Sequence, residues 1–347
     1  MPSFIDRVMA IGAEIFSPDQ TAQKVTVKVT PSSAPGQQQQ PKQTSPSTPQ
    51  QQQVQQVQPP VAPKPPVAVD SAFFIGKGHE VCQDYVTSSS NAARGFVVLA
   101  DGCSSSPETD VGARLLVKIS ETHIPRVPII DPRAYAAKIE NYYLQVAQES
   151  RDLALRLGLN ETCLDATLLG IQADAKGNFI ATCYGDGVVA LARRDGLVEI
   201  YSSSYTEGYP RYPSYAISPA RTEAFERVPN NRKKITYHLL SGRDSVQQSY
   251  ESSTKLDCYI GNRSRYKWVA VMSDGVHSFT RWMQTETGRW QEGIPVEEVL
   301  TKMLDFKGVM TGEFTKRRMK KFLHECEKAG WEHHDDLSIG VIYLGDD

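Results

Sequence analysis

The chain has 347 residues, of which 38 are Lys or Arg and 40 are Asp or Glu, so its formal net charge is -2. A protein whose main task is to coat nucleic acid or an anionic membrane carries an excess of basic residues, so this balance argues against both partners. Apolar residues make up 40% of the chain, slightly below the globular average, which indicates that a polar segment dilutes an ordinary core.

Several features of the sequence favour a cytoplasmic location. The chain contains no run of about 18 apolar residues that would predict a transmembrane helix. Residues 1–16 lack the basic start and the apolar block of a signal peptide. The cysteines are scattered without a C-x-x-C pair, as is typical of proteins in a reducing compartment: Cys82, Cys103, Cys163, Cys183, Cys258 and Cys326.

The first 69 residues differ in composition from the rest. Residues 1–30 place Phe4, Val8 and Ile11 near one helical face, and we interpret them as either a loosely ordered tail or a short segment that docks on a partner. Residues 31–69 are mostly Gln, Pro, Ser and Thr without an aromatic side chain, so we predict a disordered linker. Its P-x-x-P spacings within 60–66 are a second candidate for partner docking.

From Asp70 onward the pattern predicts one well-buried domain over 70–347. Apolar runs predict strands at 71–75, 95–100, 166–173, 179–184, 188–193, 197–201, 267–272 and 337–344. Helical periodicity predicts helices at 113–122, 132–157, 295–306 and 312–329. Residues 206–265 are polar and rich in Tyr and Pro, which indicates an irregular excursion with short strands. Because strands outnumber helices and often follow one another as hairpins, we predict an α+β fold with antiparallel sheets and helices outside.

Aspartates stand where the predicted strands begin or end. Asp101-Gly102 and Asp274-Gly275 follow two apolar strands, Asp335-Asp336 precedes the last strand, and Asp84 and Asp186 flank others. A single Asp-Gly pair is most often a turn, as we expect for Asp195-Gly196. Several converging carboxylates, however, form a pocket that cations must neutralise, and all-oxygen ligands favour Mg²⁺ or Mn²⁺. Such ions can activate a water for attack on phosphorus.

The order of these motifs resembles that of the metal-dependent serine/threonine protein phosphatases of the 2C class, in their bacterial form. The resemblance covers most of 71–345. It rests on Gln83-Asp84 for the family's acidic pair, Asp101-Gly102 for D-G-x-G-G, Asp165-Ala166-Thr167-Leu168 for G-[ST]-T-A, Gly185-Asp186-Gly187 for G-D-S-R, Ser273-Asp274-Gly275 for A-S-D-G and Asp335-Asp336-Leu337-Ser338 for D-N-[IM]-T.

The resemblance implies two antiparallel β-sheets packed face to face, with helices on the outer faces, and two or three Mn²⁺ or Mg²⁺ ions. In the family, the counterpart of Asp101 bridges two metals and that of Gly102 binds through its carbonyl. The resemblance makes Asp274 and Asp335 direct ligands, Asp84 a contact to metal-bound waters, and Asp186 a ligand of a third site. The nucleophile would be a metal-bridging water activated around Asp101 and Asp274. Residues 206–265 would be the family's flap.

The chain departs from the family pattern at several positions. Ser104 and Ser105 replace the later glycines of D-G-x-G-G, and Cys103 stands where some members have a general-acid His. Val188 stands in place of the Arg of G-D-S-R. Phosphate binding, which an Arg performs in eukaryotic members, would fall to Lys77 or His79, because phosphate requires positive charge and donors. Asp336 in place of Asn either strengthens metal affinity or faces solvent.

Three functions remain open on these residues. The first is a protein serine/threonine phosphatase that hydrolyses phosphoserine or phosphothreonine in a phosphorylated protein substrate. The second is a catalytically idle domain of the same fold that serves as a phosphoprotein-binding or regulatory scaffold, which the altered positions motivate. The third is another phosphoryl-transfer enzyme such as a nuclease, and the near-neutral charge counts against it.

Overall fold

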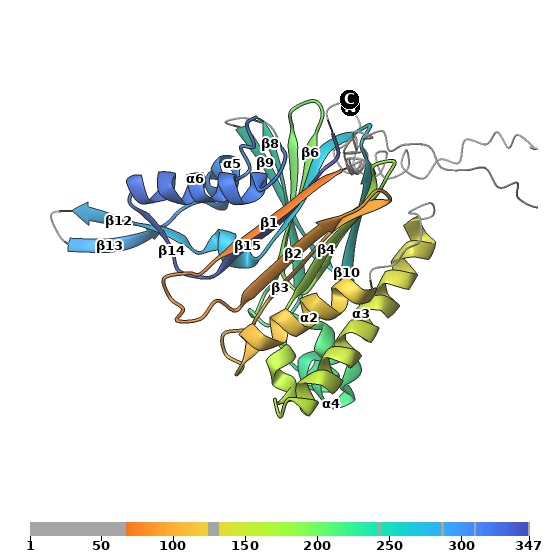
Figure 1. The fold of residues 1–347 in the computed structure, drawn as a ribbon. Coiled ribbons are helices and arrows are strands. Elements are labelled where there is room, and N and C mark those ends of the chain that lie inside the picture. The colour runs from red at the N-terminus through yellow and green to blue at the C-terminus, as the bar shows by residue number, and fades with distance from the viewer. Residues whose placement is uncertain (1–66, 124–131, 242–243, 286–287, 309, 346–347) are drawn as a thin grey trace, which may run out of the picture. The chain divides into compact units, whose positions relative to one another are not determined.

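The computed structural model describes residues 67–123, 132–241, 244–285, 288–308 and 310–345 (Figure 1). Its α-helices are α2 (Thr109–His123), α3 (Pro132–Arg156), α4 (Pro219–Glu226), α5 (Val296–Met303) and α6 (Phe314–Lys328), and its 3-10 helices are η1 (Glu161–Leu164), η2 (Pro213–Ile217) and η3 (Asp274–His277). Its strands are β1 (Ala68–Phe74), β2 (Asp84–Ser90), β3 (Arg94–Asp101), β4 (Leu168–Asp174), β5 (Asn178–Tyr184), β6 (Gly187–Arg193), β7 (Val198–Tyr205), β8 (Lys233–Ser241), β9 (Asp244–Ser252), β10 (Leu256–Asn262), β11 (Tyr266–Met272), β12 (Phe279–Thr285), β13 (Gly288–Gly293), β14 (Trp331–His333) and β15 (Leu337–Tyr343).

The strands form two large antiparallel sheets and one small one. The larger sheet has seven strands in the order β1-β15-β11-β6-β7-β8-β9, and the second has five in the order β10-β5-β4-β3-β2. Strands β13, β12 and β14 form the small sheet, which extends to the left in Figure 1. The predicted α+β class with antiparallel sheets is confirmed.

The two large sheets pack face to face because their strands are apolar on both sides. Successive residues of β3 alternate between two cores: Val97 and Leu99 point toward the seven-stranded sheet, whereas Val98 and Ala100 point toward the helices. The inner core also takes Val271 from β11 and Ile342 from β15. The sheets approach so closely that a Cβ on Gly340 would lie 2.0 Å from Val97 Cγ1.

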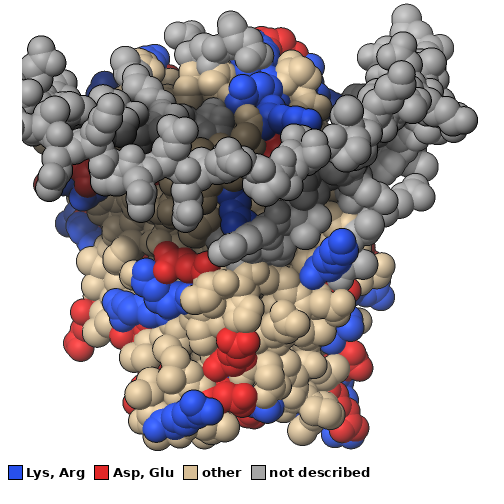
Figure 2. Space-filling view, turned by 45° about the vertical axis from the view of Figure 1, so that its right-hand side comes forward, with Lys and Arg blue, Asp and Glu red and all other residues tan. Residues whose placement is uncertain are grey.

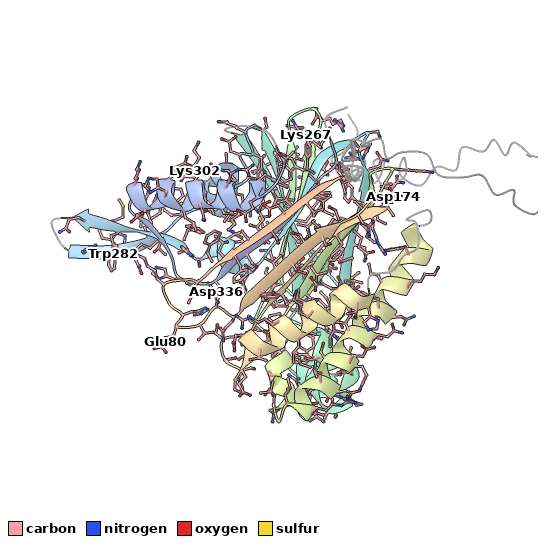
Figure 3. All side chains as sticks on the ribbon, viewed as in Figure 1. Glu80, Asp174, Lys267, Trp282, Lys302 and Asp336 are labelled. Carbon is pink, nitrogen blue, oxygen red and sulfur yellow. The ribbon has the colours of Figure 1, made fainter. Side chains whose placement is uncertain are left out.

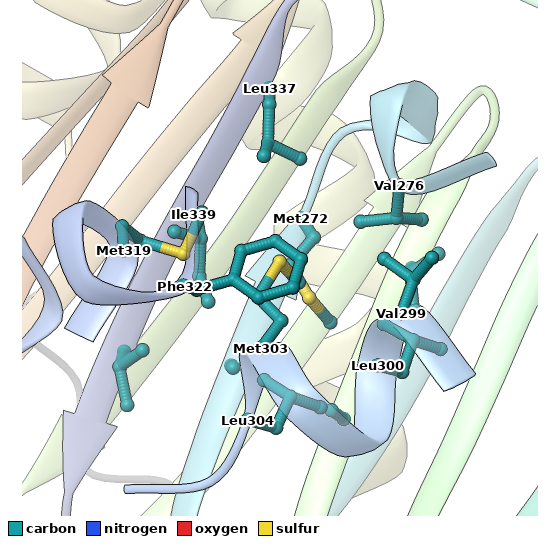
Figure 4. Close-up of a cluster of buried hydrophobic side chains, with 14 of the residues drawn as sticks. Met272, Val276, Val299, Leu300, Met303, Leu304, Met319, Phe322, Leu337 and Ile339 are labelled. Atoms are coloured by element: carbon teal, nitrogen blue, oxygen red, sulfur yellow. The ribbon is translucent and has the colours of Figure 1, made fainter. Parts of the chain in front are cut away.

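Helices cover both outer faces, so the domain has four layers. Helices α2 and α3 pack on the five-stranded sheet, and α5 and α6 pack on the seven-stranded sheet. Figure 4 shows the second of these interfaces, where Met303 and Phe322 of the helices meet Met272 and Ile339 of the strands. Asp70 of β1 accepts hydrogen bonds from the backbone N–H groups of Thr315 (2.6 Å) and Lys316 (3.1 Å), and so caps the start of α6.

The structure differs from the sequence expectation over 206–265. Only residues 206–232, which contain η2 and α4, leave the sheets. The remainder forms β8 and β9, which extend the seven-stranded sheet, and β10, which extends the five-stranded sheet. Strand β9 shows no apolar alternation because this edge strand is exposed from Val246 to Glu251, so burial does not select its side chains. The predictions for 1–30 and for all but the last three residues of 31–69 lie outside the described residues.

No helix in the described ranges combines the length and the apolar character needed to cross a membrane. On the face shown in Figure 2, basic and acidic side chains are interspersed wherever grey atoms do not cover the surface. This distribution agrees with the near balance of charges in the sequence.

We expect Gly340→Ala to lower the free energy of unfolding by about 1–3 kcal/mol, because the new methyl group overpacks the contact between the sheets. Denaturant unfolding measures the loss. Val97→Ala removes the clashing methyl groups, so the double variant should be more stable than the sum of the two single losses predicts. Gly293→Ala is the control, since a Cβ there meets no atom within 4 Å. Additive losses for Gly340→Ala and Val97→Ala would contradict this account of the sheet contact.

Candidate functional site

The predicted aspartates meet at one end of the two sheets. Asp84 begins β2 and is the direct cross-strand partner of Asp101, which ends β3. Asp186 lies in the turn between β5 and β6, and Asp274 begins η3 just after β11. Asp335 immediately precedes Asp336 and β15. Figure 3 places Asp336 near the loop that contains Glu80, at the opposite end of the sheets from Asp174.

The carboxylates lie close enough to change one another's pKa. Burial raises the pKa of Asp101 well above its usual range, and the charges of Asp84, Asp274, Asp186 and Asp335 raise it further. Burial, followed by repulsion from Asp274, raises the pKa of Asp186 to about 8. The pKa of Asp274 is raised by burial and then by Asp335. The structure therefore brings all five predicted aspartates into one acidic cluster.

Asp84 occupies the deepest position in the acidic cluster. Its side chain is only 1% exposed, and neither of its carboxylate oxygens has a hydrogen-bond partner. Burial raises the pKa of Asp84 to about 7, although the hydroxyls of Ser273 and Ser338 oppose the shift. A buried carboxylate without a partner is costly, so this group favours a cation or ordered water beside it.

The chemistry of the cluster fits a hard divalent cation. Its side-chain donors are carboxylate oxygens, and their mutual repulsion is what a bound cation relieves. In the part of the chain that the structure describes, no three His, Cys, Asp or Glu side chains converge closely enough to hold a metal ion as they stand.

The Asp101-Gly102 turn is held mainly by backbone hydrogen bonds. The Thr167 N–H donates to the Asp101 carbonyl oxygen (2.8 Å), and the Gly102 N–H donates to the Gln83 carbonyl oxygen (3.2 Å). Gly102 is buried, and a Cβ there would meet the Cβ of Thr109 at 2.9 Å. Only glycine allows this turn to pack so closely against α2.

Asp336 has a role that neither sequence alternative anticipated. Its side chain is 2% exposed, so it does not face solvent. Its carboxylate accepts hydrogen bonds from the backbone N–H groups of Gly76 (2.8 Å) and Gln83 (2.6 Å). Asp336 therefore fixes the β1–β2 loop beside the acidic cluster. The Asp335-Asp336 doublet could have indicated this role in the sequence. Adjacent residues of an extended chain point to opposite sides, so only one of the two carboxylates can face the acidic cluster.

The two candidate phosphate-binding cations lie in different surroundings. Lys77 Nζ is 2.7 Å from Glu332 at an exposed position. His79 Nδ1 lies 2.9 Å from Asp336 Oδ2, and His79 Nε2 lies 3.5 Å from Asp335 Oδ1. Burial lowers the pKa of His79, but Asp336 and Asp335 outweigh that effect, so the net shift is upward. His79 therefore places positive charge beside the cluster.

Two of the positions that depart from the family pattern, Cys103 and Val188, are occupied by packed side chains, whereas Ser104 and Ser105 are exposed. Cys103 is half-buried, with its Sγ 3.1 Å from Ser105 Oγ. Burial raises the pKa of the Cys103 thiol, but interactions with Ser105 and Tyr212 outweigh it and leave the pKa lowered. Val188 is fully buried in the apolar core beneath α5 and α6.

Sequence reasoning missed an ion pair beside the Asp101-Gly102 turn. The Asp165 carboxylate pairs with the Arg221 guanidinium of α4, and both side chains are largely buried. The Ser106 hydroxyl donates to the same carboxylate (2.9 Å). No pattern in the sequence connects Asp165 with Arg221, because 56 residues separate them.

Comparison with known proteins gives a family match over most of the domain. The sequence model of the family described as Protein phosphatase 2C matches residues 76–324. This range includes Asp84, Asp101, Asp186 and Asp274, whereas Asp335 lies beyond it. Among curated proteins, none matches at a significant level.

Several solved structures are similar at low sequence identity. A bacterial serine phosphatase is 11% identical with a TM-score of 0.49, and the alignment covers 81% of this chain and 99% of that one. The serine/threonine phosphatase Stp1 of Staphylococcus aureus is 11% identical with a TM-score of 0.49 and coverages of 81% and 96%. The serine/threonine phosphatase of S. agalactiae is 13% identical with a TM-score of 0.45 and coverages of 80% and 100%. The family match extends over well more than half of the sequence, and the chain therefore belongs to the protein phosphatase 2C family.

Proposed function

We propose that this chain is a metal-dependent protein phosphatase that hydrolyses phosphoserine or phosphothreonine in a protein substrate. The acidic cluster is the observation that supports the proposal best. It retains a carboxylate at Asp84, Asp101, Asp186, Asp274 and Asp335, although burial and repulsion make the charges of the first four costly. A domain that only binds phosphoproteins would not need to keep buried carboxylates that repel one another.

Two or three Mg²⁺ or Mn²⁺ ions would supply positive charge and an activated water in this site. Asp101, the Gly102 carbonyl, Asp274 and Asp335 would hold two of the ions, and Asp84 would contact the waters bound to them. Asp186 would hold a further ion. Asp101, Asp186, Asp274 and Asp335 are partly exposed, so a substrate can approach them from solvent.

His79 is the better candidate of the two cations for contacting the substrate phosphate. Its Nε2 lies 3.3 Å from Ser104 Oγ, so an imidazole and a hydroxyl that can donate to phosphate lie together beside Asp335. Cys103 stands where some members have a general-acid His, so the leaving group would be protonated by water or by another residue. The free thiols of all six cysteines support a cytoplasmic location.

We expect the full chain to hydrolyse a phosphothreonine peptide in the presence of Mn²⁺ or Mg²⁺ but not in the presence of a chelator. Asp274→Asn should lower kcat/KM roughly 100-fold or more, because losing even a group that supports a metal ligand costs about 10–100-fold. A phosphate-release assay measures both effects. Asp195→Asn is the matched control, since Asp195 lies in an exposed turn and pairs with Arg193. A parent chain without activity would favour the scaffold function instead.

The raised carboxyl pKa values predict how stability depends on pH in the metal-free chain. The folded state holds protons on Asp84 and Asp186 up to about pH 7 and 8, whereas the unfolded state releases them near pH 4. Stability should therefore fall as pH rises from about 4 to about 8, and Tm in chelator should be lower at pH 8.5 than at pH 6.

Mn²⁺ should restore Tm at the higher pH, because a ligand at 100 times its Kd stabilises by about 2.7 kcal/mol. Asp84→Asn should flatten the pH dependence of the metal-free chain, whereas Asp195→Asn should leave it unchanged. Thermal unfolding followed by circular dichroism measures both. A Tm that is the same at both pH values in chelator would contradict the electrostatic account of the acidic cluster.

A further inference from the structure

Asp165 connects two parts of the domain that are distant in the sequence. It stands where the family motif G-[ST]-T-A has glycine, and its side chain is buried. One carboxylate oxygen accepts a hydrogen bond from the Ser106 hydroxyl (2.9 Å) in the loop after Asp101. The other oxygen pairs with Arg221 of α4 and lies 3.4 Å from the hydroxyl of Ser214 in η2.

The backbone around Asp165 is joined directly to the Asp101-Gly102 turn. The Asp165 carbonyl oxygen accepts the Cys103 N–H at 2.7 Å. Ala166 forms an isolated antiparallel bridge with Gly102. The Thr167 N–H donates to the Asp101 carbonyl oxygen, and the Thr167 hydroxyl accepts the Asp101 N–H at 3.3 Å. A shift of residues 165–167 must therefore displace the turn as well.

Helix α4 has no fully buried residue. Its half-buried Phe225 packs against tyrosines of β7 and η2, whereas its Arg221 is directed toward the turn. Arg221 pairs with Asp165 and also lies over the ring of Tyr215, 4.6 Å from its centroid. The Thr222 hydroxyl donates to the Tyr215 carbonyl oxygen (2.6 Å), which links α4 to η2 but not to the turn.

We propose that the buried Asp165–Arg221 pair is a positioning pair that couples residues 213–226 of η2 and α4 to the loop at 101–106. Breaking one partner would leave the other charge buried without compensation, so the two segments keep one arrangement while the pair is intact. The pair holds Asp101 and Gly102 in place for cations, a consequence that rests on the proposed function. A substrate or partner that displaces α4 would accordingly weaken metal binding.

Hydrogen exchange of the full-length chain tests the coupling without any need for metal or activity. Arg221→Gln should accelerate exchange in α4 and also at 101–106 and 165–167. Arg221→Lys, which keeps the charge, should restore slow exchange in part. Arg227→Gln is the matched control, because Arg227 follows α4 directly and pairs with Glu223 at a position where its side chain is 75% exposed. This variant should accelerate exchange in α4 alone.

The proposal is wrong if Arg221→Gln accelerates exchange only in α4, or if Arg227→Gln affects the 101–106 loop to the same extent. Should Arg221→Gln fail to fold, Asp165→Asn takes its place, because it keeps the size of the side chain and an acceptor for Ser106. The same exchange pattern is expected from it, and unchanged exchange at 213–226 would overturn the coupling.

Calorimetric titration with Mn²⁺ measures the consequence for the site. The Kd for Mn²⁺ should rise roughly tenfold in Arg221→Gln and remain unchanged in Arg227→Gln. The double variant Asp165→Asn/Arg221→Gln should bind no more weakly than either single variant, because both remove one interaction. Equal Kd values for Arg221→Gln and the parent would refute the link to metal binding. A parent chain that binds no Mn²⁺ would refute the proposed function, and hydrogen exchange would still decide the coupling.

Discussion

The acidic site depends on how closely two loops, which contain Gly76 and Gly275, approach the backbone of His334, Asp335 and Asp336. A Cβ on Gly275 would lie 1.9 Å from the Asp336 carbonyl oxygen, and a Cβ on Gly76 would lie 2.3 Å from the Asp335 carbonyl carbon. Neither position has room for a side chain. The buried Asp336 carboxylate then holds the β1–β2 loop through two backbone N–H groups. This contact brings the loops that bear Asp84, Asp274 and Asp335 to one place.

The acidic cluster lowers the stability of the folded domain locally, and the packed core around it compensates. Asp84 and Asp101 face each other across two strands at the floor of the site, where burial and repulsion favour the protonated forms. The sheets around them are closely packed, as the approach of Gly340 to Val97 shows. Functional sites commonly contain arrangements that are locally unfavourable in this way. The rigid core keeps the repelling carboxylates from moving apart.

The departures from the family pattern form a connected arrangement around the Asp101-Gly102 turn. Ser104 and Ser105 take the place of the later glycines, and the next residue, Ser106, donates to the carboxylate of Asp165, which itself replaces a glycine of the family pattern. Arg221 then neutralises that carboxylate from α4. Val188, in place of an arginine, points into apolar core and makes no polar contact there. The positions that differ therefore have structural partners of their own, while the five predicted aspartates remain together.

The sequence by itself determined the acidic cluster and most of the core strands. Asp101 and Asp274 could be predicted because each follows a continuous apolar run, which a strand with two buried faces requires. Tertiary structure alone decided the roles of Asp336, Asp165 and Arg221, because their partners are far away in the sequence. It also decided that β8, β9 and β10 join the sheets. Strand β9 is exposed, so burial does not impose an apolar alternation that would identify it in the sequence. The pattern of apolar and polar residues along a helix or strand indicates which of its faces is buried. Hydrogen bonds and ion pairs between distant residues form only when the chain folds, so no local pattern predicts them.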